Sequence, residues 1–272
     1  MSNYPEFEKR EWAGWQERAT NYDATTLKMT GTTIPRLVER TDIRANQKVL
    51  DVCCGTGAVT RHLVAAGACV EGVDFSAAMI EQSERNIPDA RFSVADAQNL
   101  PFENAVFDAV LTNFGHYHLP DPEQAIKEAA RVLKPGGRYG FTTWVGPEES
   151  EGFRLIFETI LGNLDPEIVL PPAPDPFHLA DEVNSAHILS TAGCENIAVE
   201  TFQSEITCEP DAFVPFLKAA TVRATLVLKA QPLTVQRRIE ALLREKIEQF
   251  VRDGMVCLPL PNRIITATRS GD

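Results

Sequence analysis

The sequence has no long apolar run and no excess of basic residues. No stretch approaches the roughly 18 consecutive apolar residues of a membrane-spanning helix, and the opening MSNYPEFEKREWAGW is polar rather than signal-like. Lys and Arg number 26 against 38 Asp and Glu, which gives a formal net charge of −12. This balance opposes binding to a polyanion. We therefore expect no nucleic-acid partner, no membrane insertion and a cytoplasmic location.

Metal-binding and disulfide patterns are also missing. The six cysteines form no Cys-x-x-Cys pair and no cluster with histidine: Cys53, Cys54, Cys69, Cys194, Cys208 and Cys257. Such spacing is typical of reduced thiols in a cytosolic protein, and we expect no metal site. The sequence contains neither repeats nor low-complexity tracts, so its 272 residues fit one large domain or a domain with an insertion.

Short apolar runs alternate with helical patterns between residues 46 and 145. KVLDVCC, ACVEGVD, RFSVAD, FDAVLTN and RYGFTTW have the composition of strands, and DPEQAIKEAARVLKPGG is an amphipathic helix stopped by Pro135 and the glycines. This alternation predicts an α/β fold, a Rossmann-like doubly wound sheet that is mostly parallel.

The two flanking regions do not show this alternation of strands and helices. Residues 1–45 carry aromatic residues at helical spacing and predict an N-terminal helical lid. Residues 146–272 are expected to complete the sheet, with a strand at NIAVETFQSEIT and a last strand at RIITATR. An inserted helical cap is predicted at about 146–180 and 211–254. The apolar face of its last helix would pack on the protein itself or form a homodimer.

The stretch VLDVCCGTG, residues 49–57, joins the first strand to a helix. Gly55 and Gly57 lack a Cβ, so a ligand can approach the backbone N–H groups at the helix start. Taken alone, the motif fits a nucleotide-binding turn or a tight bend. A reactive-thiol site at Cys53 and Cys54 is less favoured than small residues that fit a crowded turn.

Acids follow three consecutive strands. Asp51 ends the first, Asp74 stands 23 positions later at the end of the second, and Asp96 follows the third. Carboxylates here would repel a pyrophosphate but attract a cationic nucleoside. Charge therefore favours S-adenosyl-L-methionine over NAD as the ligand.

Together these segments resemble the class I S-adenosylmethionine-dependent methyltransferases. The closest branch acts on small molecules and includes the ubiquinone and menaquinone biosynthesis type, with its type 11 methyltransferase domain. From Lys48 to Trp144 the order and spacing of VLDVCCGTG, VEGVDFS, ARFSVADAQNLPF, FDAVLTNFGHYHLPDP and RVLKPGGRYGF match that pattern. The resemblance implies a seven-stranded sheet, S-adenosyl-L-methionine as cofactor and S-adenosyl-L-homocysteine as product.

The resemblance also implies roles for the residues at the strand ends. Asp51, Gly55 and Gly57 would form the turn beneath the methionine part of the cofactor, and Asp74 would bind the ribose hydroxyls. Cys53 stands where the family usually has glycine, so its side-chain contacts depart from the pattern. Contacts to adenine and to the methionine end would come from Tyr22, Phe75, Met79, Asp96, Ala97, Asn113 and Phe114.

Methyl transfer from a sulfonium requires positioning more than a fixed catalytic group. His116 and His118 follow the fourth strand and are candidates for a base that deprotonates an acceptor hydroxyl or amine. The apolar content of the cap favours a small hydrophobic or aromatic acceptor. Three alternatives remain: a cyclase that binds the cofactor without methyl transfer, an NAD-dependent oxidoreductase, and a nucleic-acid or protein methyltransferase.

Overall fold

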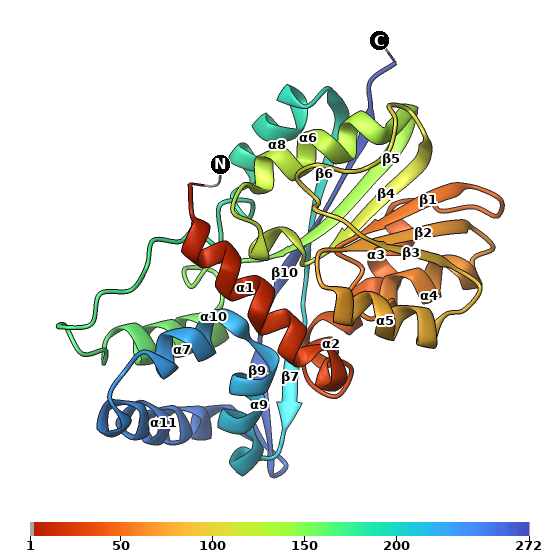
Figure 1. Cartoon of the computed structure of the whole chain (residues 1–272). Helices are drawn as coiled ribbons and strands as arrows, with labels where there is room; N and C mark the ends of the chain where they lie inside the picture. The colour runs from red at the N-terminus through yellow and green to blue at the C-terminus, as the bar shows by residue number, and fades with distance from the viewer. Residues whose placement is uncertain (1–2, 272) are drawn as a thin grey trace.

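A seven-stranded sheet lies at the centre of the computed structural model, which describes residues 3–271 (Figure 1). Its strands are β1 (Lys48–Val52), β2 (Cys69–Asp74), β3 (Arg91–Val94), β4 (Phe107–Asn113), β5 (Leu133–Trp144), β6 (Cys194–Phe202) and β10 (Asn262–Arg269). The order is β3-β2-β1-β4-β5-β10-β6. Neighbours among β1 to β5 pair in parallel, and β10 pairs antiparallel with β5 and β6. The predicted doubly wound, mostly parallel sheet is confirmed.

Helices cover both faces of this sheet. They are α3 (Ile34–Arg40), α4 (Ala58–Ala65), α5 (Ala77–Asn86), α6 (Pro122–Val132) and α8 (Glu182–Thr191). In β1, Val49 packs in the cluster of α3 and α4, whereas its neighbour Leu50 packs in the cluster of α6 and α8. Both residues are fully buried. Burial on two faces explains why the strands are continuous apolar runs.

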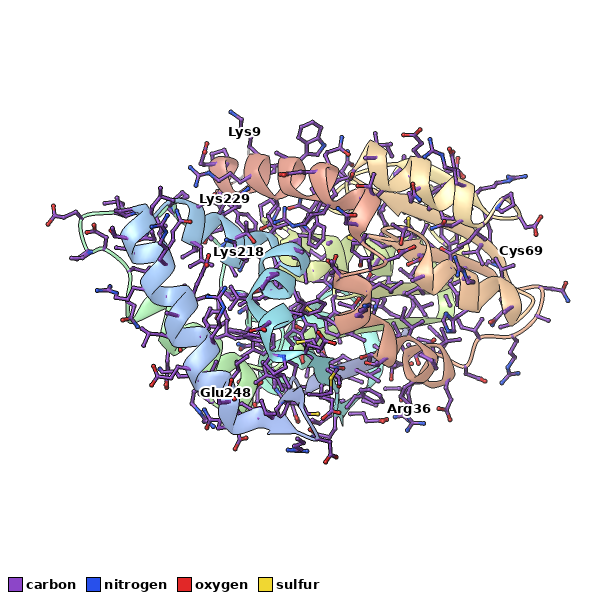
Figure 2. All side chains as sticks on the ribbon, turned by 90° about the horizontal axis from the view of Figure 1, so that it is seen from below. Lys9, Arg36, Cys69, Lys218, Lys229 and Glu248 are labelled. Atoms are coloured by element: carbon purple, nitrogen blue, oxygen red, sulfur yellow. The ribbon has the colours of Figure 1, made fainter. Side chains whose placement is uncertain are left out.

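Two further groups of elements lie at the carboxyl ends of the parallel strands. The N-terminal group contains α1 (Pro5–Arg18) and α2 (Thr26–Thr30). The cap contains α7 (Glu151–Leu161), α9 (Phe213–Ala220), α10 (Val222–Lys229), α11 (Leu233–Ile247) and a small sheet of β7 (Glu205–Cys208), β9 (Met255–Pro259) and β8 (Val251–Arg252). Short 3₁₀ helices are η1 (Ala19–Asn21), η2 (Gly31–Thr33), η3 (His116–His118), η4 (Pro210–Ala212) and η5 (Glu248–Phe250). Figure 2 shows Glu248 of the cap and Cys69 of β2 at opposite ends of the molecule.

The cap has its own apolar core. Ile239, Leu243 and Ile247 of α11 are fully buried in one cluster with residues of α7 and α9. The apolar face of the last cap helix therefore packs on the protein itself, as the first of the two expectations had it. Among residues 3–271, no helix combines the length and the apolar character that a membrane crossing needs.

Two predicted boundaries were wrong, and one hairpin was not predicted. The helix expected to run to Pro135 ends at Val132, because Leu133 already pairs with Phe107 in the sheet. The strand expected at NIAVETFQSEIT is divided between β6 and β7, which belong to different sheets. The hairpin of β8 and β9 was not predicted, although Asp253 and Gly254, both at positive φ, form an Asp-Gly turn typical of hairpins.

The cap segment predicted to be helical at about 211–254 is interrupted at Thr221, between α9 and α10. This residue has an extended backbone, with φ −126° and ψ 127°. Arg18 of α1 donates hydrogen bonds to the carbonyl oxygens of Lys218, Ala219 and Thr221. The free carbonyls at the end of α9 are thus satisfied by a side chain about 200 positions away. A local sequence pattern cannot show such a helix cap.

Candidate functional site

A cavity of about 460 Å³ opens between the sheet, the N-terminal helices and the cap. Its wall includes the carboxyl-end turns of β1, β2 and β4, the edge at which open α/β sheets bind ligands. Nine of the predicted site residues line it: Tyr22, Cys53, Gly55, Asp74, Phe75, Met79, Asn113, Phe114 and His118. The other five, Asp51, Gly57, Asp96, Ala97 and His116, do not.

The turn after β1 depends on left-handed backbone conformations. Gly55 has φ +53° and Gly57, which caps α4, has φ +88°. A Cβ on Gly57 would lie 2.6 Å from the Cδ1 atom of Ile87. Gly55 faces the ring of Tyr22, where a Cβ would have 3.5 Å of room. Gly57 therefore permits a left-handed backbone and close packing of Ile87, whereas at Gly55 there is room beside Tyr22 for the ligand approach that the motif predicted.

Cys53 adopts the same left-handed region, with φ +57°, without being glycine. Its side chain is accommodated by Gly115 in the loop after β4, where an added Cβ would lie 2.4 Å from the Cys53 Cβ. Burial, with Asp74 and Asp51 nearby, raises the pKa of the Cys53 thiol well above its usual value. The thiol is therefore protonated at neutral pH, and this disfavours a nucleophilic role.

Two buried carboxylates lie behind and beside this turn. Asp74 accepts hydrogen bonds from the backbone N–H of Gly55 (3.0 Å) and Ser76 (2.9 Å), yet burial raises its pKa to about 6. Asp51 accepts two bonds from Thr60 through Oδ2, whereas its buried Oδ1 has no partner among the described residues. Burial raises the pKa of Asp51 to about 7. Both carboxylates would be stabilised by a positive charge.

The third acidic position lies outside the cavity. Asp96 is exposed, two residues beyond the end of β3, and accepts hydrogen bonds from the backbone and side-chain nitrogens of Gln98. Ala97 points into the sheet core, where it is 5% exposed. Asp96 and Ala97 therefore do not line the cavity, although Ala97 belongs to the cluster on which Cys53 packs and the Asp96 charge acts on the Cys53 thiol.

The end of β4 forms the floor of the cavity. Asn113 donates a hydrogen bond to the carbonyl of Thr30 (3.2 Å) and accepts one from Thr142 (2.8 Å). Phe114, with φ +56°, stacks on Trp144 with ring centroids 4.1 Å apart. These contacts hold the loop after β4 against both the N-terminal helices and β5.

The two candidate histidines occupy different environments. His116 is 4% exposed, pairs through Nε2 with the Tyr139 hydroxyl at 2.9 Å and packs on Phe141. Burial lowers its pKa to about 3, so it stays neutral and is a poor proton acceptor. His118 lines the cavity, and its Nδ1 lies 2.8 Å from Oε2 of Glu11. Of the two histidines, only His118 lines the cavity.

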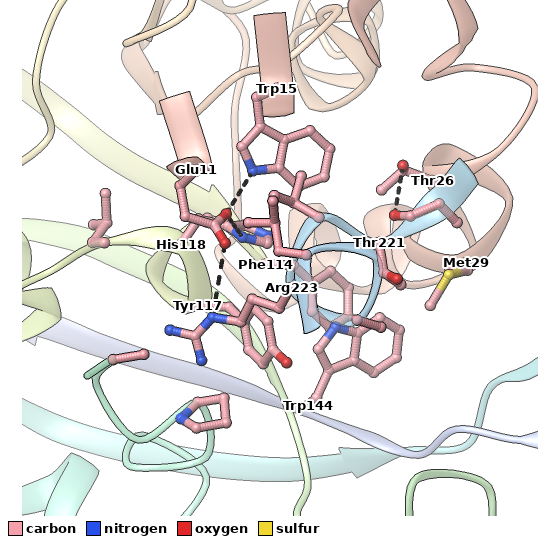
Figure 3. Close-up of a pocket in the computed structure, with 18 of the residues that line it drawn as sticks. Glu11, Trp15, Thr26, Met29, Phe114, Tyr117, His118, Trp144, Thr221 and Arg223 are labelled. Carbon is pink, nitrogen blue, oxygen red and sulfur yellow. Dashed lines mark hydrogen bonds and ion pairs between the residues drawn. The ribbon is translucent and has the colours of Figure 1, made fainter. Parts of the chain in front are cut away.

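Glu11 of α1 is the main site residue that the sequence did not reveal (Figure 3). It is fully buried, accepts a hydrogen bond from the Trp15 indole at 3.0 Å and contacts His118. Its Oε1 lies 3.9 Å from Nε of Arg223 on α10. A signal existed: Phe7, Glu11 and Trp15 are four residues apart, so the acid sits on the apolar face of a helix.

The far side of the cavity is apolar. Trp144 contacts Phe153 edge to face at 5.5 Å, and Phe153 contacts Phe157 at 6.0 Å. Further apolar wall residues come from the cap and its loops: Ile156, Ile160, Leu170, Leu217, Leu226, Val227 and Leu260. The cavity thus joins a carboxylate-lined end at the sheet to an apolar end at the cap.

Comparisons with known proteins agree with this arrangement. Residues 49–137 match a family model described as a methyltransferase domain. The chain is 33% identical over 194 residues to a demethylmenaquinone methyltransferase of Corynebacterium kroppenstedtii, covering 65% of this chain and 82% of that protein. Identity to the Paenarthrobacter aurescens demethylmenaquinone methyltransferase is 41% over 102 residues, covering 38% of this chain and 40% of that relative. The YcgJ structure from Bacillus subtilis superposes with a TM-score of 0.60 at 18% identity, covering 88% and 99% of the two chains.

The match to the Corynebacterium protein covers 65% of this chain, more than the residues 49–137 that match the family model. The structural match shows the same fold. Sequence motifs, sheet order and relatives agree, and this chain belongs to the class I S-adenosylmethionine-dependent methyltransferases, in the branch of the quinone-biosynthesis type.

Proposed function

We propose that this chain binds S-adenosyl-L-methionine at the carboxylate-lined end of the cavity and methylates a small aromatic acceptor at the apolar end. The proposal depends on the observation that Asp74 and Gly55 line the same cavity as Trp144 and Phe157. A cationic nucleoside and an apolar ring can therefore meet inside it.

The residues present fit the cofactor. Asp74 lines the cavity and burial raises its pKa to about 6, so a cationic ligand beside it would stabilise its carboxylate form. Gly55 leaves the backbone accessible opposite Tyr22. We assign the ribose hydroxyls to Asp74 and the adenine to Phe75 and Met79. The bound cofactor supplies a methyl group that is already activated on a sulfonium.

The chain's own contribution is to position the acceptor and to exclude water. Trp144, Phe153 and Phe157 form a wall suited to a flat apolar ring. The relatives named above are demethylmenaquinone methyltransferases, and a quinone-like acceptor fits such a wall. His118 is the candidate for a proton acceptor when the acceptor carries a hydroxyl group.

We assign a separate role to each of the three predicted regions of the chain. Residues 1–45 form a lid that contributes Glu11 and Trp15, and residues 46–145 hold the cofactor. Residues 146–272 complete the sheet and supply the cap over the acceptor. No group of three or more metal-ligating side chains occurs within residues 3–271.

Turnover with labelled cofactor tests this function. The protein is incubated with methyl-labelled S-adenosyl-L-methionine and a reduced naphthoquinone, and S-adenosyl-L-homocysteine and labelled product are measured. Equal amounts of both support methyl transfer. Product formed in a cofactor-dependent way without S-adenosyl-L-homocysteine would favour the cyclase alternative. Absence of calorimetric binding of S-adenosyl-L-homocysteine would refute the proposal.

A further inference from the structure

Arg223 brings a poorly compensated cation into the cavity. Its side chain is 15% exposed, and its guanidinium lies between the rings of Phe7 (4.5 Å) and Tyr117 (4.7 Å). Nη1 donates a long hydrogen bond of 3.3 Å to the carbonyl of Pro174. Nε and Nη2 are buried and have no hydrogen-bond partner among the described residues. Unmet donors on a buried guanidinium are costly unless a ligand satisfies them.

Arg223 has only a distant counterion. Its nearest acid is Glu11, whose Oε1 lies 3.9 Å from Nε of Arg223 and whose Oε2 lies 2.8 Å from Nδ1 of His118. Asp74 also carries a negative charge near His118. An anionic oxygen on a bound ligand would give the Arg223 guanidinium a closer partner than Glu11 does.

Other charged groups of the cavity are already engaged. Arg10 pairs with Glu6 at 2.8 Å, and both side chains are more than a third exposed. Asp175 accepts a hydrogen bond from the backbone N–H of Phe177 (2.9 Å), and Asp74 accepts bonds from the turn after β1. None of these groups supplies the anion that Arg223 lacks.

We propose that Arg223 is the anion-binding residue of the acceptor subsite, where it holds a hydroxyl oxygen of the acceptor ring as an oxyanion. This inference rests on the proposed function and names the residue that binds the acceptor oxygen. Glu11 is a positioning residue: it holds Nδ1 of His118, so that Nε2, which has no hydrogen-bond partner among the described residues, can accept a proton.

The step balances in protons and electrons. The hydroxyl proton moves to Nε2 of His118, and the resulting oxyanion accepts hydrogen bonds from Arg223. A bond then forms from the oxyanion, or from a ring carbon conjugated with it, to the methyl group. The sulfur–methyl bond breaks at the same time and sulfur keeps the electron pair. For attack by carbon, the ring proton at that carbon is lost afterwards to water and aromaticity returns.

Arg223 could instead serve only to join α1, η3 and α10 by stacking on Phe7 and Tyr117. Binding of an ionisable phenol separates the two roles, because a purely structural cation has no effect on the protonation of a bound ligand. The probe is para-nitrophenol, whose yellow phenolate is measured directly, and its methyl ether para-nitroanisole cannot ionise. Both are titrated into protein saturated with S-adenosyl-L-homocysteine.

We expect the wild-type protein to bind para-nitrophenol at least about tenfold more tightly than para-nitroanisole, with the pKa of the bound phenol lowered so that phenolate absorbance appears at a more acidic pH. Arg223→Gln should remove both the preference and the shift, and Arg223→Lys should retain part of each. Arg10→Gln, which removes a cation paired at the rim, should behave as wild type.

Two outcomes would overturn the inference. One is wild-type protein that binds para-nitrophenol no better than the ether, or not at all, a readout that needs no variant. The other is a folded Arg223→Gln protein with unchanged preference and shift. Calorimetry with S-adenosyl-L-homocysteine on the same samples keeps the two proposals apart: loss of that binding in wild type refutes the proposed function, whereas its retention directs any failure to Arg223.

Discussion

The two ends of the cavity are built by different means. The carboxylate-lined end consists of backbone turns and the strand-tip acid Asp74, and its sheet residues, from Cys53 to Phe114, lie close in sequence. The apolar end consists of side chains from helices far apart in the chain, such as Phe153 and Leu226. A bound nucleoside needs fixed backbone groups, whereas an acceptor pocket needs shape. The residues of the first end can therefore be predicted from the sequence, whereas those of the second cannot.

The largest expected effect comes from a substitution at the carboxylate-lined end. Gly115→Ala places a Cβ 2.4 Å from the Cβ and 2.7 Å from the Sγ of Cys53, although its own φ of −70° suits alanine. We expect a loss of about 3 kcal/mol in the free energy of unfolding, measured with urea. Phe157→Ala removes a half-buried side chain at the apolar end and should lower the free energy of unfolding by less.

Cys53→Gly is the matched second change. It removes the clashing side chain and relieves a left-handed non-glycine residue. In the Gly115→Ala background it should restore at least half of the lost stability. Equal losses with and without Cys53→Gly would show that the clash does not decide the effect.

The next prediction compares two strand-tip acids. Asp74→Ala should weaken S-adenosyl-L-methionine binding by at least tenfold, because it removes charge-assisted hydrogen bonds of about 1.5–3 kcal/mol. Asp96→Ala, at an exposed position outside the cavity, should leave the affinity unchanged. Isothermal calorimetry measures both. Unchanged affinity of Asp74→Ala would refute the ribose assignment, and weakened binding of Asp96→Ala would return that residue to the site.

The smallest effect is in the pH dependence of stability. Burial raises the folded-state pKa of Asp51 from 3.8 to about 7, so between these values the folded protein holds more protons than the unfolded chain. Its contribution to stability is present at acidic pH and lost as the pH rises through about 7. Asp51→Asn keeps an acceptor for Thr60 without a charge.

Ligand-free Asp51→Asn protein should therefore lose about 1 kcal/mol less stability than wild type between pH 6 and pH 7.5. Urea titrations at the two pH values measure this difference. Asp74, whose pKa is raised to about 6 for the same reason, keeps part of the slope in both proteins. Identical slopes would show that Asp51 ionises freely in the folded state.

The core was predictable because local patterns and long-range packing agree there. The alternation of strands and helices predicted the parallel sheet that is observed. The glycines of the first turn predicted its left-handed backbone, and the position of Asp74 predicted an acid at the edge of the sheet. Asp96 and His116 show the limit of that reasoning. Both belong to the matching motifs, but β3 ends before Asp96 reaches the cavity, and His116 turns into the core against Tyr139.

The sequence by itself determined the parallel sheet, the tight turn after the first strand and the negatively charged edge of the sheet. These features depend on the order of apolar, small and acidic residues within a few tens of positions. Tertiary structure alone decided which charges meet. Glu11, His118 and Arg223 come from three segments, and Arg18 ends α9 from the first helix. Contacts of this kind depend on how helices pack, and packing is a property of the whole chain.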